Sequence, residues 1–299
     1  MHGLQTAMLT SKFGMLAQEV LTAFRRWHDS QALNLCGIHL HLGSQNPDGQ
    51  PYTDAFIKLF ELMKQIFDET GKHLEHLNLG GGFPVNYLRD RSNASMIGED
   101  RQELFAADLD PAEVLGKAVA VVRDTFGASA AHLLENLTIL LEPGRSVIAD
   151  AGLVLTTVRN KKERPLPDSS VDSWLLTDAG YNIMLSMNNY KWYYHMLSAS
   201  RAGESLETKY KIAGPLCDGG DVYFDIEGAN KLPDHRLLPE NVEVGEILAL
   251  LNCGAYSLAQ MFPYNGRPLP AAVLVKENGE VELIRKRDSY ELLIESDIW

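Results

Sequence analysis

Three short stretches of the sequence decide the fold: residues 35–45 read LCGIHLHLGSQ, residues 74–84 read LEHLNLGGGFP, and residues 137–145 read LTILLEPGR. Each begins as an apolar run and ends in a cluster of glycine, polar or charged residues, which is typical of a buried strand that leaves a sheet. Because the carboxyl ends of parallel strands meet at one edge of an α/β sheet or barrel, we expect the three clusters to converge on one site.

Helical periodicity precedes and separates these strands. Apolar residues recur at helical spacing over residues 14–29, 56–67 and 110–126. The alternation of helix and strand indicates a parallel sheet covered by helices. The polar segment 89–103 is expected to form a loop.

The character of the sequence changes after Asp150. Short runs rich in β-branched residues, separated by Gly, Pro, Asn and Asp, indicate the strands of a β-rich domain. A length of 299 residues also fits two domains of average size. We therefore expect an α/β domain over residues 1–151 and a C-terminal β domain, a barrel or a sandwich, over residues 152–299.

Charge and cysteine content narrow the class of protein. The 40 acidic and 27 basic residues give a formal net charge of -13, so neither nucleic acid nor a membrane is an expected partner. The sequence shows no signal peptide and no run of the roughly 20 apolar residues that a membrane helix needs. Three widely separated cysteines, without metal-binding spacing, favour a reducing compartment. These features predict a cytoplasmic protein.

The three strand-end clusters contain the groups that a phosphate site needs. Glycines at 80–82 would let backbone N–H groups approach an anion closely, although a tight turn without a ligand is the ordinary alternative. Ser44 adds a hydroxyl donor, and Arg145 adds a fixed positive charge at neighbouring strand ends. Together they favour phosphate binding.

Two further strand-end residues leave alternatives open. His39 and His41 share one face of a strand, as in the metal sites of barrel hydrolases, but the later strand ends lack the additional ligands that such a site requires. No metal is therefore predicted. A single imidazole, His41, could instead lie against an aromatic cofactor, while His39 could serve only backbone hydrogen bonds. Glu142 could pair with a protonated ring nitrogen or form a simple ion pair with Arg145.

The second half contains one candidate reactive thiol. Cys217 and Asp218 stand side by side in the glycine-rich turn GPLCDGGD, residues 214–221. Neighbouring acidic groups favour the protonated thiol, which suits a residue that donates a proton. Cys36 and Cys253 lie in apolar segments and are expected to pack in the core.

Five ordered motifs together resemble the ornithine/diaminopimelate/arginine decarboxylases, which depend on pyridoxal 5'-phosphate (PLP) and belong to the alanine-racemase-like fold type III. The motifs are HLGS at 41–44, GGGFP at 80–84, EPGR at 142–145, CDGGD at 217–221, and GAY at 254–256 followed by YNGRP at 264–268. Each motif alone is weak, but their order over this length is specific.

The resemblance implies an α/β plus β fold: the C-terminal part of a PLP-binding (β/α)8 barrel over residues 1–151, then the β domain over residues 152–299. It implies a homodimer that shares active sites and decarboxylates a small amino-acid substrate. By motif position His41 would stack on the pyridine ring, Glu142 would pair with its nitrogen, and Cys217 would reprotonate the substrate carbon. Asp218 would face the distal amine, and the residues that would bind the phosphate are Ser44, Gly82, Gly144, Arg145 and Tyr256.

The resemblance also implies a lysine that this sequence does not carry at a matching motif. Family members place their Schiff-base lysine on a strand upstream of an SKFG segment, which here occupies residues 11–14. Lys12 belongs to that segment and is expected near the dimer interface, and Lys191 and Lys211 match no motif. We therefore expect an N-terminally truncated sequence that begins at an internal methionine and is inactive alone. A split subunit or a non-catalytic remnant of the fold is the alternative.

The substrate is not determined by the motifs. HLGSQ resembles the diaminopimelate branch, whereas Cys217–Asp218 resembles the ornithine branch, in which the aspartate binds a terminal ammonium. Residues 181–195 occupy the place of an Arg-Pro-x-x-Tyr motif of the diaminopimelate enzymes but contain no arginine. Diaminopimelate, ornithine, lysine and related diamino acids therefore all remain candidates.

Overall fold

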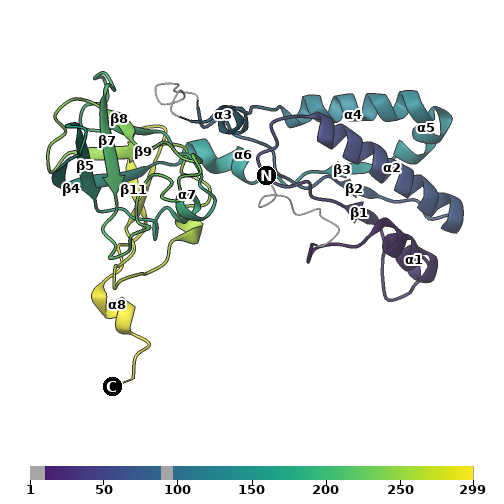
Figure 1. Cartoon of the computed structure of the whole chain (residues 1–299). Coiled ribbons are helices and arrows are strands. Elements are labelled where there is room, and N and C mark those ends of the chain that lie inside the picture. Colours follow the sequence, from purple (N-terminus) through teal and green to yellow (C-terminus); the bar gives the residue numbers. More distant parts are fainter. Residues whose placement is uncertain (1–10, 89–96, 299) are drawn as a thin grey trace. The chain divides into compact units, whose positions relative to one another are not determined.

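The protein is described by a computed structural model that covers residues 11–88 and 97–298. It divides into two compact units (Figure 1): Met1–Asn86 with Glu103–Ile148, and Tyr87–Gln102 with Ala149–Trp299. Tyr87 belongs to the second unit, where its ring packs edge-on against Trp192 and Tyr194, with ring centroids 5.5 and 5.7 Å away. The expected domain ranges, 1–151 and 152–299, stay predictions.

The first unit is built on a parallel sheet of three strands in the order β1-β2-β3. Ile38 pairs with Leu77, and Leu77 pairs with Ile139, so the three central residues lie in one row across the sheet. The parallel sheet predicted from the alternation of helix and strand is confirmed. Its elements are α1 (Ala17–Trp27), β1 (Gly37–His39), α2 (Gln50–Thr70), β2 (His76–Asn78), α4 (Pro111–Phe126), α5 (Ala128–Leu134), β3 (Thr138–Leu140) and α6 (Arg145–Ile148).

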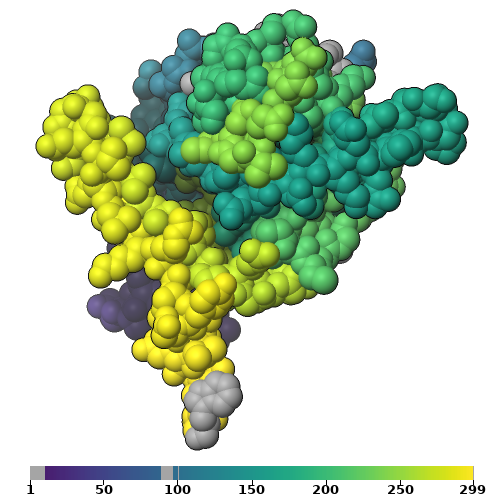
Figure 2. All heavy atoms as spheres, turned by 90° about the vertical axis from the view of Figure 1, so that its left-hand side faces the viewer, coloured from purple at the N-terminus to yellow at the C-terminus, as the bar shows by residue number. Residues whose placement is uncertain are grey.

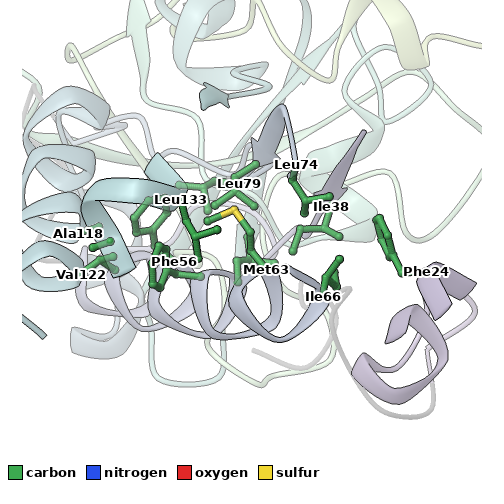
Figure 3. Close-up of a cluster of buried hydrophobic side chains, with 14 of the residues drawn as sticks. Phe24, Ile38, Phe56, Met63, Ile66, Leu74, Leu79, Ala118, Val122 and Leu133 are labelled. Atoms are coloured by element: carbon green, nitrogen blue, oxygen red, sulfur yellow. The ribbon is translucent and has the colours of Figure 1, made fainter. Parts of the chain in front are cut away.

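The core of this unit forms where α2 and α4 meet the strands. Phe56, Met63 and Ile66 lie on one face of α2 and point toward strand residues such as Ile38 (Figure 3). All three α2 side chains are at most 1% exposed. Burial of a side chain of this size contributes roughly 1.5–3 kcal/mol, so this interface anchors the strands whose ends carry the predicted site.

Helix boundaries follow ordinary capping rules. Asp110, which precedes α4, accepts a hydrogen bond from the N–H of Ala112 at 2.8 Å, and Pro111 occupies the first helical position. Gly71 ends α2 in the left-handed conformation, φ +70°, which glycine adopts without strain. The loop expected over 89–103 is wrong in part, because α3 (Glu99–Phe105) begins within it; residues 89–96 lie outside the described residues.

The second unit is β-rich. A six-stranded sheet runs in the order β6-β9-β4-β5-β7-β8, and β10 and β11 form a separate antiparallel hairpin. Figure 2 shows the C-terminal segment, in yellow, at the edge of this unit. The elements are η3 (Ala149–Ala151), β4 (Val154–Pro165), β5 (Val171–Thr177), α7 (Leu185–Asn189), β6 (Met196–Ser198), β7 (Thr208–Ala213), β8 (Arg236–Leu238), β9 (Ile247–Leu250), η4 (Leu258–Gln260), β10 (Ala272–Val275), β11 (Val281–Arg285) and α8 (Tyr290–Ile294).

The helices of the described residues are also short or polar relative to a bilayer. None of them combines the length and apolar character that a membrane span requires.

Candidate functional site

Three consecutive glycines bring the strand ends of the first unit together. A Cβ atom at Gly80 would collide with the carbonyl oxygen of Leu40, and one at Gly82 with that of Gly43, both in the loop after β1. A Cβ atom at Gly81 would instead collide with the carbonyl oxygen of Glu142, after β3. The glycines therefore alternate between the loops on either side, and the predicted convergence of the three strand ends is observed. A simple tight turn does not account for this arrangement.

Hydrogen bonds hold the β1 loop and the β2 loop in register. Gln45 is 1% exposed; its Nε2 donates to the carbonyl oxygen of Val85 at 2.7 Å and its Oε1 accepts from the Val85 N–H at 3.0 Å. The hydroxyl of Tyr52 donates to the Gly81 carbonyl oxygen at 3.3 Å, and its ring stacks on Phe83 with centroids 4.8 Å apart. These contacts connect the glycine loop to the loop after β1 and to helix α2.

His41 is fixed in a defined tautomer. The N–H of Gly81 donates to its Nδ1 at 3.2 Å, so Nδ1 carries no proton and the neutral ring carries its proton on Nε2. Partial burial and the neighbouring His39 lower the pKa of His41, while Glu142 opposes them. The structure therefore presents a neutral imidazole of fixed orientation at the end of β1.

Glu142 lies among polar side chains of the other two strands. Asn78 Nδ2 donates to its Oε1 at 2.8 Å, and His39 Nε2 lies 3.7 Å from its Oε2. The Glu142 side chain is 56% exposed. The carboxylate thus has Asn78 as a hydrogen-bond donor and His39 nearby, and the alternative, an ion pair with Arg145, stays a prediction. The exposure of this carboxylate leaves it able to accept a further donor.

The phosphate donors predicted at the strand ends suit an anion. Among the described residues, the Ser44 hydroxyl and the N–H groups of Gly82 and Gly144 donate to no protein acceptor. The glycine positions keep this backbone free of Cβ atoms, and Ser44 lies directly beside Gly82. Arg145, 7% exposed, opens the short helix that follows Gly144. This set of donors fits a phosphate group chemically.

A metal site would need a different set of side chains. Within residues 11–88 and 97–298, no group of three or more His, Cys, Asp and Glu side chains is arranged to hold a metal ion.

In the second unit, the buried carboxylate of Asp221 organises the CDGGD turn. Its Oδ2 accepts from the Leu216 N–H and its Oδ1 from the Tyr181 N–H, both at 2.8 Å. A Cβ atom at Gly180 or at Gly214 would overlap this carboxylate, so two glycines make room for it. Burial raises the pKa of Asp221, against the effect of the two N–H donors. The turn is thereby tied to the segment that follows β5.

Asp218 and Cys217 project from this turn. The Asp218 Oδ1 accepts from the Gly220 N–H at 2.8 Å, and its Oδ2 accepts from the hydroxyls of Tyr181 at 2.9 Å and Tyr264 at 3.4 Å. The Gly220 N–H and then the Tyr181 hydroxyl lower the pKa of Asp218, which therefore stays ionised. The thiol of Cys217 is exposed, while its N–H donates to Asn265 Oδ1 at 2.8 Å.

Three further residues singled out in the sequence are Tyr256 and Cys253 of the second unit and Cys36 of the first. Tyr256 adopts a left-handed backbone, φ +59°, and its carbonyl oxygen accepts from the Ser186 hydroxyl at 3.2 Å. Its predicted contact with phosphate stays a prediction. Cys253 is buried, which raises the pKa of its thiol, so its expected packing role is consistent with the structure. Cys36 is half-buried just before β1.

Sequence reasoning missed several residues that shape the site. They are side chains whose partners lie far away along the chain, and no local pattern marks them: Gln45, Tyr52, Asn78, Tyr181 and Asn265. Gln45, Asn78, Tyr181 and Asn265 lay within stretches quoted from the sequence, but none of them carried an assigned role there.

The parallel sheet, the β-rich unit and the strand-end donors fit a class of proteins that bind a phosphate-bearing ligand, and comparisons with known proteins specify the family. The family described as "Pyridoxal-dependent decarboxylase, pyridoxal binding domain" matches residues 1–149. Diaminopimelate decarboxylase of Aquifex aeolicus is 32% identical over 295 residues, which cover 98% of this chain and 60% of the relative. The corresponding Bacillus subtilis protein is 32% identical over 296 residues, with the same two coverages, 98% and 60%.

Solved structures that resemble this chain come from the same family as these relatives. The crystal structure of the Methanocaldococcus jannaschii diaminopimelate decarboxylase superposes with a TM-score of 0.79 at 29% identity, covering 98% of this chain and 59% of that chain. The Helicobacter pylori enzyme, complexed with L-lysine, gives 0.73 at 26% identity, covering 98% and 62%. The chain belongs to the PLP-dependent decarboxylases of fold type III, and its fold is part of their barrel followed by the β domain. It spans about 60% of the length of the curated relatives that it matches.

Proposed function

We propose that this chain forms part of a PLP-dependent decarboxylase that acts on a diamino acid. The single observation that carries the proposal is the convergence, around the three glycines, of His41, Glu142 and the phosphate donors Ser44 and Gly82. The names of the relatives and the neighbour complexed with L-lysine support a diamino acid as the substrate class.

Each residue has a proposed task that its environment permits. Ser44, Gly82, Gly144, Arg145 and Tyr256 hold the phosphate. Neutral His41, held by the Gly81 N–H, would stack on the pyridine ring of the bound cofactor. Glu142 would pair with the ring nitrogen and favour its protonated form. When bound, PLP supplies an electron sink for the pair released as carbon dioxide leaves.

The CDGGD turn is proposed to complete the reaction. Cys217, exposed and without a competing side-chain bond among the described residues, donates a proton to the substrate α-carbon. Asp218 binds the distal ammonium of the substrate. By resemblance both act in the site of a second copy, so a homodimer is proposed, and analytical ultracentrifugation of the full-length protein tests it. The cytoplasmic location stays a prediction.

The activity is tested on the longest reading frame that contains these residues. The purified protein, supplied with PLP, is expected to release carbon dioxide from at least one of diaminopimelate, ornithine, lysine and arginine. Amine product measured in parallel should match the carbon dioxide in amount. If no carbon dioxide is released from any of the four substrates although the protein is folded and binds PLP, the proposed function is contradicted. That result would favour a non-catalytic member of the fold.

A further inference from the structure

The segment YNGR, residues 264–267, clamps the turn that carries Cys217 and Asp218. It does so at three points: the Tyr264 hydroxyl reaches Asp218, the Asn265 side chain accepts from the Cys217 N–H, and Arg267 donates to the Pro215 carbonyl oxygen at 3.0 Å. These three bonds join one continuous segment to one continuous turn.

Tyr181 approaches the same turn from another segment. Its hydroxyl donates to the same Asp218 oxygen as that of Tyr264, and its backbone N–H donates to Asp221. The Tyr181 and Tyr264 ring centroids lie 5.7 Å apart, and Phe262 lies 6.2 and 6.1 Å from them. Two phenols on a shared aromatic base therefore converge on one carboxylate oxygen.

This arrangement suits the recognition of an organic cation. Each carboxylate oxygen has two lone pairs, so the bonds from the phenols and from Gly220 hold Asp218 in place without using its whole accepting capacity. Aromatic ring faces also attract an ammonium group. A second carboxylate on the substrate would instead meet the negative charge of Asp218.

We propose that Tyr181 and Tyr264 are positioning residues that orient the Asp218 carboxylate, and that this unit of three side chains selects a substrate whose distal end is an ammonium without a second carboxylate. The proposal rests on the proposed function and deepens it, because it chooses lysine- or ornithine-like substrates over diaminopimelate. Tyr181 contributes more than Tyr264, since its bond to Asp218 is shorter.

The first test replaces each phenol by a phenyl ring in the full-length protein. Loss of a hydrogen bond to a charged group has an effect of roughly 1.5–3 kcal/mol, so we expect Tyr181→Phe to raise KM for lysine or ornithine about 10-fold or more. The kcat should change by less than about 3-fold, because the ring and the reacting atoms stay in place. Tyr264→Phe should raise KM less. Tyr290→Phe is the matched control, since that residue is 70% exposed and lies on α8.

The second test does not depend on turnover. Calorimetry gives the dissociation constant of 1,5-diaminopentane for the wild type, Tyr181→Phe, Asp218→Asn and the double variant. If Tyr181 acts through Asp218, both single variants bind more weakly and the double variant binds no more weakly than Asp218→Asn alone. A diaminopimelate kcat/KM at or above that for lysine in the wild type would overturn the substrate choice.

The outcomes separate this inference from the proposed function. A KM and a dissociation constant unchanged in Tyr181→Phe, or a lowered melting temperature as its only effect, would overturn the positioning role while leaving decarboxylation standing. If the wild type decarboxylates none of the substrates but binds the diamine in a Tyr181-dependent manner, the proposed function is contradicted and the positioning role is supported. If the wild type neither releases carbon dioxide nor binds the diamine, both the proposed function and the positioning role are contradicted.

Discussion

Gly82→Ala is expected to lower the free energy of unfolding by about 2–5 kcal/mol. The residue has φ +85°, a conformation that costs an L side chain roughly 1–2 kcal/mol. The added methyl group would also overlap the carbonyl oxygen of Gly43, and overpacking of this kind typically costs about 1–3 kcal/mol. Urea unfolding followed by circular dichroism measures the change.

Gly71→Ala separates the two contributions. Gly71 also has a positive φ, +70°, but a Cβ atom there would meet nothing within 4 Å. This control should therefore show only the conformational penalty, roughly 1–2 kcal/mol. Equal losses in the two variants would show that the loops after β1 and β2 can move apart, and the tight convergence of the strand ends would be wrong.

Cys217→Ala is expected to reduce the rate of amine formation by about 10²–10⁴-fold, the usual contribution of a positioned proton donor. The thiol is exposed, so its loss should leave the free energy of unfolding nearly unchanged. The measurement is kcat for carbon dioxide release together with analysis of the product, since misdirected protonation would yield carbon dioxide without the normal amine.

Cys36→Ala serves as the control for a thiol substitution. Cys36 lies just before β1, is half-buried and has no proposed chemical role. Its kcat should stay within about 2-fold of the wild type, since it does not touch the reacting atoms. A Cys217→Ala protein that turns over as fast as Cys36→Ala would remove Cys217 from the mechanism and leave the proton donor to be sought elsewhere.

The α/β half of the fold could be predicted because its pattern is local. The apolar spacing of Phe56, Met63 and Ile66 marks α2, and Asp110 with Pro111 marks the start of α4. The prediction of a loop over residues 89–103 was wrong in part, because α3 buries few apolar residues and its sequence therefore lacks a strong helical periodicity. Short strands such as β6 and β8, each three residues long, are too brief for alternation to be recognised.

The candidate site could be predicted only in its residue types and its strand ends. The motifs named His41, Glu142 and Asp218, but their partners are set by contacts that close in three dimensions. Asn78 reaches Glu142 across 64 positions of sequence, and Tyr181 reaches Asp218 across 37. Likewise, the 56% exposure of the Glu142 side chain depends on neighbours that a single strand does not reveal.

The alternating contacts of the three central glycines have a practical consequence for protein engineering. Because Gly80 and Gly82 abut the loop after one neighbouring strand and Gly81 abuts the loop after the other, no one of these loops can be redesigned in isolation. A library that varies residues 41–44 alone would mostly sample sequences that push the glycine loop outward. Productive variants should come from coupled changes in all three loops, selected together for folding before they are screened for new substrates.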